Sequence, residues 1–271
     1  PVLQLAQHRR DYSNLKVATI PVDQIYNEFS SGAKDPVALR DFSKNLFERN
    51  PQKFRYLLLF GDGSYDPKNN RKDVEYYDLV PVWETDNSLS PIEAHPSDDF
   101  FGLLSPNEPD PGGSSATYIR GSLDIAVGRI PAANLTDAQS VVDKIIAYDI
   151  SPSSLGDWHN RLIYVADDEE SNHIDQAENL SRRSLETEEW FNSSKVYFDA
   201  YQRVASSSEK RIPDAKVAIN AEIFKGALTV NYIGHGGPKG WGQERVVDIA
   251  DIQGWENKHK QTLFITATCS F

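Results

Sequence analysis

Short runs of apolar residues alternate along the chain with longer segments in which apolar residues recur at every third or fourth position. The short runs are typical of strands that are covered on both faces. They occupy residues 15–20, 55–60, 123–127, 162–165, 196–198, 228–233 and 263–267, with a shorter run at 79–83. The periodic segments predict helices at 35–50, 171–185 and 214–226, and one that begins at Asn134. Because strands alternate with helices, the pattern predicts an α/β fold with mainly parallel sheets flanked by helices.

A polar segment at 151–156, Ser-Pro-Ser-Ser-Leu-Gly, separates two series of these elements. Clusters of serine, proline and glycine between periodic segments are typical of loops and linkers. The sequence therefore predicts an N-terminal subdomain at 1–155 and a C-terminal subdomain at 156–271. Residues 66–115 are rich in proline, aspartate, asparagine and serine, which predicts long loops, and long ordered loops are often functional.

Composition and charge narrow the range of partners. The 271 residues include 28 Lys and Arg against 40 Asp and Glu, a net charge of −12, which argues against nucleic acid or an anionic membrane surface as partner. No apolar run approaches the roughly 20 residues of a membrane span. The one cysteine, Cys269, allows neither an intramolecular disulfide nor a cysteine-rich zinc site. The chain contains no methionine, so the natural start is expected to lie outside this sequence.

The stretch TVNYIGHGGP, residues 229–238, combines a buried strand with a histidine between glycines. Glycine packs poorly inside a strand, but it suits a turn where the backbone must approach another group closely. His235 would then lie on an open turn at the carboxyl end of the strand. The alternative is an ordinary loop histidine in a glycine-rich turn.

Cys269 follows the last predicted strand, as His235 follows the strand before it. The carboxyl ends of parallel strands share one edge of a sheet, where ligands bind, so both side chains can reach one crevice. An imidazole beside a thiol favours the thiolate and can later protonate a leaving amine. The backbone N–H groups of Gly236 and Cys269 could bind the oxyanion. Alternatively, Cys269 is an inert core residue.

Four blocks of the sequence resemble peptidase family C25, the gingipain-like cysteine peptidases of the caspase-like clan. VNYIGHGGPKGWG is similar to the family's histidine block and LFITATC to its cysteine block, although Thr268 stands where many members have alanine. PSDDFFG at 96–102 and DIAVGRIPA at 124–132 resemble two upstream blocks. The resemblance implies a caspase-like fold of two adjacent subdomains, with a His235–Cys269 dyad in the second.

The closest resemblance within the family is to members that act as type IX sortases. It rests on FGDGSYDPKNN, DDFFG and GRIP. It implies a cysteine endopeptidase that cleaves, or transpeptidates, the C-terminal sorting signals of exported proteins, with no required cofactor. It also implies that secretion-system components are partners. The expected location is the cell surface, outer membrane or periplasm of a Gram-negative bacterium. The resemblance further implies that this sequence is cut short after its cysteine. The alternative function is a catalytically silent scaffold with the same fold, which binds cargo or secretion partners.

The resemblance also implies roles for residues outside the dyad. Asp98 matches the position that recognises a basic residue before the scissile bond in arginine-type members, with capping of a helix or turn as the alternative. Trp241 belongs to the histidine block and is expected to contact substrate. A carboxylate that orients the histidine is expected from one loop, and its candidates are Glu84, Asp86 and Glu93.

An acidic run, Asp167-Asp168-Glu169-Glu170, follows the predicted strand at 162–165. Carboxylates grouped in a loop after a strand could hold calcium, with Asp167, Asp168 and Glu170 as the candidate ligands. The alternative is a solvated acidic loop. The remaining histidines, among them His173, show no spacing typical of metal ligands and are expected at the surface.

Overall fold

The computed structural model describes the chain except for residues 74, 86–94, 109–120, 206–209 and 269–271. It divides into two compact units, unit 1 at 1–146 and unit 2 at 147–271. The boundary predicted from the sequence, between residues 155 and 156, falls inside unit 2 and remains a prediction.

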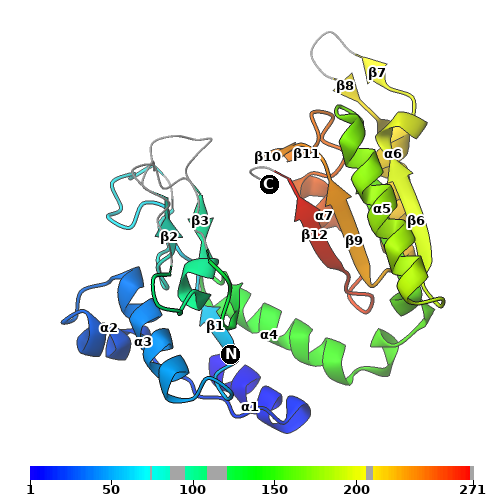
Figure 1. Cartoon of the computed structure of the whole chain (residues 1–271). Helices are drawn as coiled ribbons and strands as arrows, with labels where there is room; N and C mark the ends of the chain where they lie inside the picture. The colour runs from blue at the N-terminus through cyan, green and yellow to red at the C-terminus, as the bar shows by residue number, and fades with distance from the viewer. Residues whose placement is uncertain (74, 86–94, 109–120, 206–209, 269–271) are drawn as a thin grey trace. The chain divides into compact units, whose positions relative to one another are not determined.

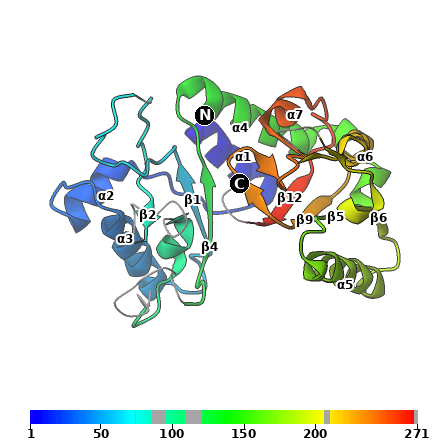
Figure 2. The same ribbon diagram turned by 90° about the horizontal axis from the view of Figure 1, so that it is seen from above.

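Unit 1 contains a parallel pair of strands, β1 (Tyr56–Phe60), which is labelled in Figure 1, and β4 (Ala126–Ile130), which lies beside it in Figure 2. A second, antiparallel pair joins β2 (Trp83–Glu84) to β3 (Pro96–Ser97), and a short 3₁₀ helix, η1 (Asp98–Gly102), follows β3. Four helices complete the unit: α1 (Val2–Ser13), α2 (Val22–Phe29), α3 (Pro36–Arg49) and α4 (Leu135–Ile150), the last of which runs across the unit boundary.

Helix α3 shows how local sequence sets an element of unit 1. Asp35 caps its first turn by accepting a hydrogen bond from the N–H of Val37, and Pro36 fills the first helical position, where no N–H is needed. The helix buries Leu39 against Leu59 of β1 and against the aromatic residues of η1. The apolar periodicity of 35–50 predicted this helix correctly.

Three predicted strands of unit 1 differ from the structure. Of the predicted run at 79–83, only Trp83 lies in a strand, β2. Residues 15–20 form no strand. The segment is largely exposed, and no other segment pairs with it in the described part of unit 1. The predicted strand at 123–127 is shifted to Ala126–Ile130, in register with β1 from Tyr56↔Ala126 to Phe60↔Ile130. Pairing with β1, rather than the local run of apolar residues, sets the limits of β4.

Unit 2 contains a four-stranded, fully parallel sheet with the order β12-β9-β5-β6. Three of its strands match the predicted apolar runs closely: β5 (Arg161–Ala166), β9 (Thr229–Ile233) and β12 (Leu263–Ala267). The fourth, β6 (Asn192–Tyr197), begins four residues before the predicted run at 196–198 and ends one residue before its end. Its helices are α5 (Ser171–Thr187), α6 (Pro213–Lys225) and α7 (Ile249–Gly254), and a short hairpin, β7 (Val204–Ala205) with β8 (Lys210–Arg211), precedes α6. The prediction of a parallel sheet flanked by helices is confirmed.

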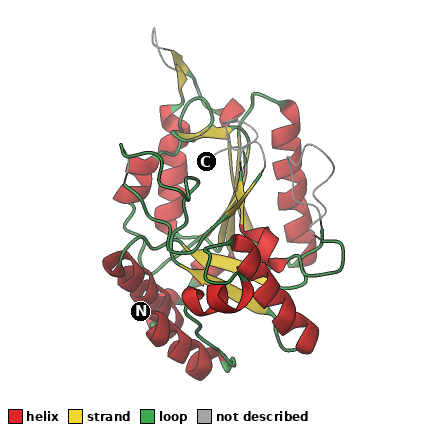
Figure 3. Ribbon diagram, turned by 90° about the vertical axis from the view of Figure 1, so that its left-hand side faces the viewer, coloured by secondary structure: helices red, strands yellow, loops and turns green. Residues whose placement is uncertain are grey.

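Helices lie on opposite faces of this sheet (Figures 2 and 3). Alternate residues of its strands pack against them. On one face Ala166 and Ile233 contact Ala177 of α5. On the other face Ile163, Val165, Val230 and Tyr232 form the larger core with the buried side of α6. Both faces are covered at the central strands β5 and β9, which explains their continuous apolar runs, whereas four of the five residues of the edge strand β12 are exposed.

The strands end together at the carboxyl edge of this sheet. Ile233 lies opposite Ala166 of β5 and Ala267 of β12, so the segments after three neighbouring strands begin side by side. This edge is where ligands bind in parallel α/β sheets. Among the described helices of both units, none is long and apolar enough to cross a membrane.

Candidate active site

His235 lies just beyond the carboxyl end of β9, and its backbone is held by three hydrogen bonds. Its N–H donates to the Asp167 carboxylate, and its carbonyl accepts from the Gly242 N–H at 2.7 Å and from the Tyr232 hydroxyl at 2.5 Å. The imidazole itself is 42% exposed. The turn therefore fixes the main chain of His235 while its ring faces solvent.

The glycine before His235 is required by close packing. A Cβ on Gly234 would lie 2.6 Å from the Tyr232 hydroxyl and 2.7 Å from the Asp167 carboxyl group. Gly240, in the hairpin after the histidine, has φ +142°, and a Cβ there would lie 2.3 Å from the carbonyl oxygen of Val247. Gly234 thus allows the backbone to approach its neighbours closely, as the sequence predicted, whereas a Cβ on Gly237 would have no neighbour within 4 Å.

A two-residue hairpin pair follows, in which β10 (Gly236–Gly237) pairs with β11 (Gly240–Trp241). Gly236, the expected oxyanion donor, lies opposite Trp241 in this pair and is partly exposed. Trp241 is only 1% exposed and stacks on Tyr232 at 4.4 Å between ring centroids. Trp241 therefore packs in the core next to the hairpin, and its expected contact with substrate remains a prediction.

Two carboxylates lie beside the His235 ring. Glu169 Oε2 and Glu170 Oε1 are each 3.8 Å from His235 Nε2, and Gln243 donates a 3.1 Å hydrogen bond to Glu169. The Glu169 side chain is 21% exposed and that of Glu170 is 56% exposed. Both carboxylates therefore lie close enough to the ring to restrict its orientation.

Asp167 is the buried centre of this edge of the sheet. Its side chain is 0% exposed, and one of its oxygens accepts the His235 N–H while the other lies 2.5 Å from His173 Nδ1. Burial, followed by the negative charges of Asp167 and Glu244, raises the pKa of Tyr232. Tyr232 therefore stays protonated and keeps donating to the His235 carbonyl.

His173 lies next to His235, a position that the sequence did not predict. It was expected at the surface, but its side chain is only 15% exposed and its ring packs edge-on against His235, with centroids 5.2 Å apart. It lies in the first turn of α5, which starts directly after the acidic run. A histidine placed shortly after the end of a predicted parallel strand was the signal that could have indicated this position.

The three candidate calcium ligands have separate partners. Asp167 is bonded to His235 and His173, and Glu170 lies beside the His235 ring. Asp168 forms an ion pair with Arg203, which also bonds Glu244 at 3.2 Å. A calcium ion would have to displace these contacts, so calcium binding here remains a prediction.

Asp98 of unit 1 already has a cationic partner. Its two carboxylate oxygens accept hydrogen bonds of 2.7 and 2.8 Å from Arg129 of β4, whose side chain is 11% exposed. The same guanidinium donates to the carbonyls of Gly61 and Val80 at 2.9 and 2.8 Å. Asp98 therefore joins η1 to β4, and its expected role in recognising a basic substrate residue remains a prediction.

The carboxylates expected to orient His235 are Glu84, Asp86 and Glu93, and the structure describes only the first of them. Glu84 lies on β2 in unit 1, and burial raises the pKa of its carboxyl group. Asp86 and Glu93 lie outside the described residues. Within unit 2 the carboxylates next to the imidazole are Glu169 and Glu170, which come from the acidic run.

The strand that leads to Cys269 is the neighbour of the strand that leads to His235. β12 pairs in parallel with β9, from Leu263↔Thr229 to Ala267↔Ile233, which confirms that the two strands are adjacent and parallel. Cys269 itself lies outside the described residues, so the distance from its sulfur to His235 remains a prediction.

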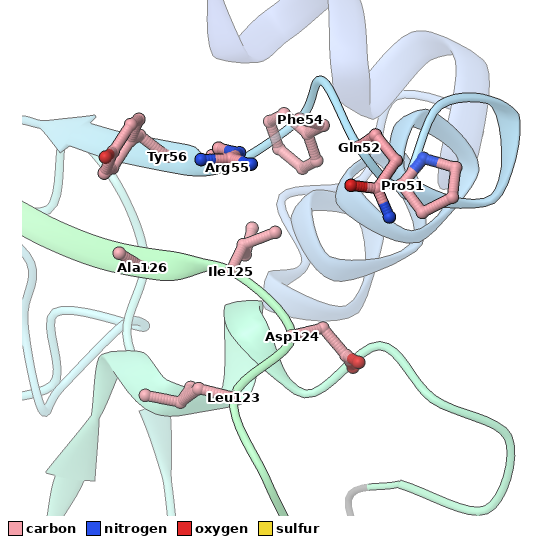
Figure 4. Close-up of a pocket in the computed structure, with 9 residues that line it drawn as sticks. All are labelled: Pro51, Gln52, Phe54, Arg55, Tyr56, Leu123, Asp124, Ile125 and Ala126. Atoms are coloured by element: carbon pink, nitrogen blue, oxygen red, sulfur yellow. The ribbon is translucent and has the colours of Figure 1, made fainter.

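An open pocket of about 480 Å³ occurs at a different place, in unit 1 (Figure 4). It is lined by residues at the amino ends of β1 and β4, among them Tyr56, Asp124 and Ala126. Parallel sheets bind ligands at the carboxyl ends of their strands, so this position is unfavourable for a catalytic site. The polar groups with catalytic chemistry are at the carboxyl edge of the sheet in unit 2.

Comparison with known proteins agrees with this architecture. A sequence model of peptidase family C25 matches residues 1–271. A complex of the pro- and mature domains of RgpB from Porphyromonas gingivalis aligns with TM-score 0.65 and 15% identity, covering 98% of this chain and 52% of that one. The Arg-specific cysteine proteinase gingipain R (RgpB) aligns with TM-score 0.58 and 17% identity, covering 89% and 46%.

A third solved structure, dimeric latent PorU from Porphyromonas gingivalis, aligns with TM-score 0.43 and 28% identity over 54% of this chain and 14% of that one. No curated protein matches the sequence. The chain spans about half the length of the two gingipain chains. The structural likeness to the gingipains confirms the predicted caspase-like α/β fold.

Proposed function

Because this chain belongs to peptidase family C25, we propose that it carries the catalytic dyad of a cysteine endopeptidase, with His235 as the base and Cys269 as the nucleophile. The observation that supports this dyad most directly is the pairing of β9 with β12. The two strands are parallel and end in register, His235 follows one of them, and Cys269 follows the other in the sequence. The exposed imidazole on a fixed backbone suits a group that exchanges protons with a substrate.

The proposed reaction proceeds through an acyl-enzyme. His235 takes the thiol proton, and the Cys269 thiolate adds to the carbonyl carbon of the scissile peptide bond. The backbone N–H groups of Gly236 and Cys269 stabilise the oxyanion. The C–N bond then breaks as the imidazolium gives its proton to the leaving amine. Water, or an acceptor amine in transpeptidation, attacks the thioester and regenerates the thiol.

Glu169 and Glu170 are the proposed orienting carboxylates. Their oxygens at 3.8 Å from His235 Nε2 stabilise the imidazolium that forms when the thiol loses its proton. The backbone bonds from Asp167 and Tyr232 hold the turn in place while the ring changes its charge. The expectation for Glu84, Asp86 and Glu93 remains a prediction beside this proposal.

The proposed substrates are exported proteins that carry C-terminal sorting signals. The support is the resemblance of FGDGSYDPKNN, DDFFG and GRIP to the type IX sortases. On the same support we place the protein at the cell surface, outer membrane or periplasm of a Gram-negative bacterium, with secretion-system components as partners. The catalytically silent scaffold is the competing function.

The test is active-site labelling of the full-length protein with a peptidyl acyloxymethyl ketone, followed by mass-spectrometric mapping of the modified residue. Modification at Cys269 that is lost in the His235→Ala variant is expected, since the imidazole generates the reactive thiolate. Replacing His259, an exposed histidine of the same unit, by alanine is the control and should leave labelling unchanged. Absence of labelling, or labelling elsewhere, would favour the scaffold.

A further inference from the structure

Asp167, His173 and His235 form a compact cluster at the carboxyl ends of β5 and β9. One nitrogen or oxygen from each of the three side chains lies within 4.8 Å of the others. The two imidazole rings meet edge-on with centroids 5.2 Å apart, and Asp167 Oδ1 lies 2.5 Å from His173 Nδ1. The cluster joins the loop after β5, the first turn of α5 and the turn after β9.

These donors suit a transition metal better than calcium. Imidazole nitrogen together with carboxylate oxygen is a common donor set for Zn²⁺, whereas Ca²⁺ requires six or more oxygen ligands. Tetrahedral Zn²⁺ with bonds of about 2.0–2.1 Å places neighbouring donor atoms about 3.4 Å apart. The 3.8 Å separations of Glu169 Oε2 and Glu170 Oε1 from His235 Nε2 are near this value, so either carboxylate can add a ligand.

The contact between Asp167 and His173 also resembles the environment of a ligand histidine. A ligand imidazole usually gives its second ring N–H to a carboxylate, which sets the tautomer and the orientation of the ring. When His173 donates its Nδ1–H to Asp167, the lone pair of its Nε2 remains for a metal. Asp167 is fully buried and also holds the His235 backbone, so this arrangement exists before any ion arrives.

We propose that Asp167, His173 and His235 form a binding site for Zn²⁺ or a similar divalent transition metal, in which His173 and His235 are ligands, Asp167 orients His173, and Glu169 or Glu170 adds a further ligand. An ion reaches the site from the side of His235, whose side chain is 42% exposed. The side chains of His173 and Asp167 are 15% and 0% exposed. Binding does not require the cysteine or peptidase activity. If the proposed dyad is correct, metal coordination occupies the lone pair of His235 and reversibly inhibits the enzyme.

The experiment is a titration of the purified protein with Zn²⁺ by calorimetry, and with Co²⁺ by its visible absorption. We expect one ion per chain and at least tenfold weaker binding in His173→Gln, because loss of a ligand or of its orienting partner costs about 10–100-fold in affinity. His259→Gln, in the same unit, is the matched control and should bind as the wild type does. Equal affinity in His173→Gln, or no saturable binding by the wild type, would overturn the site.

A Cys269→Ser variant separates this site from metal capture by the thiol. We expect the affinity of this variant for Zn²⁺ to stay within about threefold of the wild-type value. Loss of Zn²⁺ binding in the variant would overturn the proposal. If circular dichroism shows that His173→Gln is unfolded, His235→Gln decides the question, because its partly exposed ring can be replaced without opening the core. That variant should also lose at least tenfold in affinity. Metal binding without labelling of Cys269 would refute the dyad alone.

Discussion

Gly234 lies between the buried end of β9 and the candidate catalytic histidine, where the chain has no room for a side chain. We predict that Gly234→Ala lowers the free energy of unfolding by about 1–3 kcal/mol, as overpacking in a core does. The added methyl group would overlap the Tyr232 hydroxyl and the Asp167 carboxyl group. Urea unfolding measures the effect.

The matched control is Gly237→Ala in the hairpin that follows. An added Cβ there has no neighbour within 4 Å, and we expect a change within about 0.5 kcal/mol. Equal stability of the two variants would show that the turn before His235 can relax, and the packing explanation for this glycine would then be wrong.

The ion pair between Asp98 and Arg129 gives a second prediction at this scale. We expect Asp98→Asn to lower the free energy of unfolding by about 1–3 kcal/mol, because it leaves a guanidinium that is 11% exposed without its carboxylate partner. Thermal unfolding provides the measurement, and Asp99→Asn is the control, since the Asp99 side chain is exposed.

The same variant bears on substrate recognition. One outcome is that the Asp98→Asn variant is as stable as the wild type but turns over peptides with arginine or lysine before the scissile bond more slowly. Asp98 would then bind substrate, and the structural role assigned to it would be wrong. Loss of stability with equal effects on basic and apolar peptides supports the structural role.

Helix α6 illustrates how one face of an element carries most of its stabilising contacts. Ile223 is 0% exposed and packs into the core beneath the sheet, whereas Val217 of the same helix is 66% exposed. We predict that Ile223→Ala costs about 2–5 kcal/mol through lost burial and a residual cavity.

Val217→Ala, the control on the opposite face of α6, should change stability by less than about 0.5 kcal/mol, since alanine favours the helix and little burial is lost. Chemical denaturation of both variants measures the difference. Similar losses in the two variants would mean that α6 contributes through its helical propensity and not through the face it buries.

Buried and partly buried tyrosines make the free energy of unfolding of both units depend on pH in the alkaline range. Burial raises the pKa of Tyr26 in unit 1 to about 12, and burial also raises the pKa values of Tyr197 and Tyr232 in unit 2. A raised pKa in the folded state means that folding favours the protonated phenol. The stabilisation is fully present below the unfolded-state pKa of about 10 and is lost as pH rises through the folded-state value.

We therefore expect the free energy of unfolding to decrease between about pH 10 and pH 12. Urea unfolding at a series of alkaline pH values measures this decrease, and Tyr26→Phe and Tyr197→Phe should each make it shallower. Stability that is independent of pH across this range, or unchanged in both variants, would contradict the prediction.

Much of unit 2 could be predicted from the sequence, because its central strands are largely buried and its helices bury one side. Apolar runs and helical periodicity are local consequences of that burial, so they located β5, β9, α5 and α6. The apolar run at 263–267 also located β12, although four of its five residues are exposed. Histidine and glycine at the end of β9 indicated a functional turn for the same local reason. In unit 1, by contrast, pairing with β1 moved β4 away from the apolar run, and the segment at 15–20 has no partner strand.

Which side chains surround His235 was decided by the tertiary structure alone. The acidic run and His173 are near the histidine only because β5 pairs directly with β9, an adjacency between segments far apart in the chain. Burial of Trp241 and the bond from Arg129 to Asp98 likewise depend on packing between distant elements. Residue type and local spacing report the chemistry that is available, whereas strand order in the sheet determines which of those groups meet.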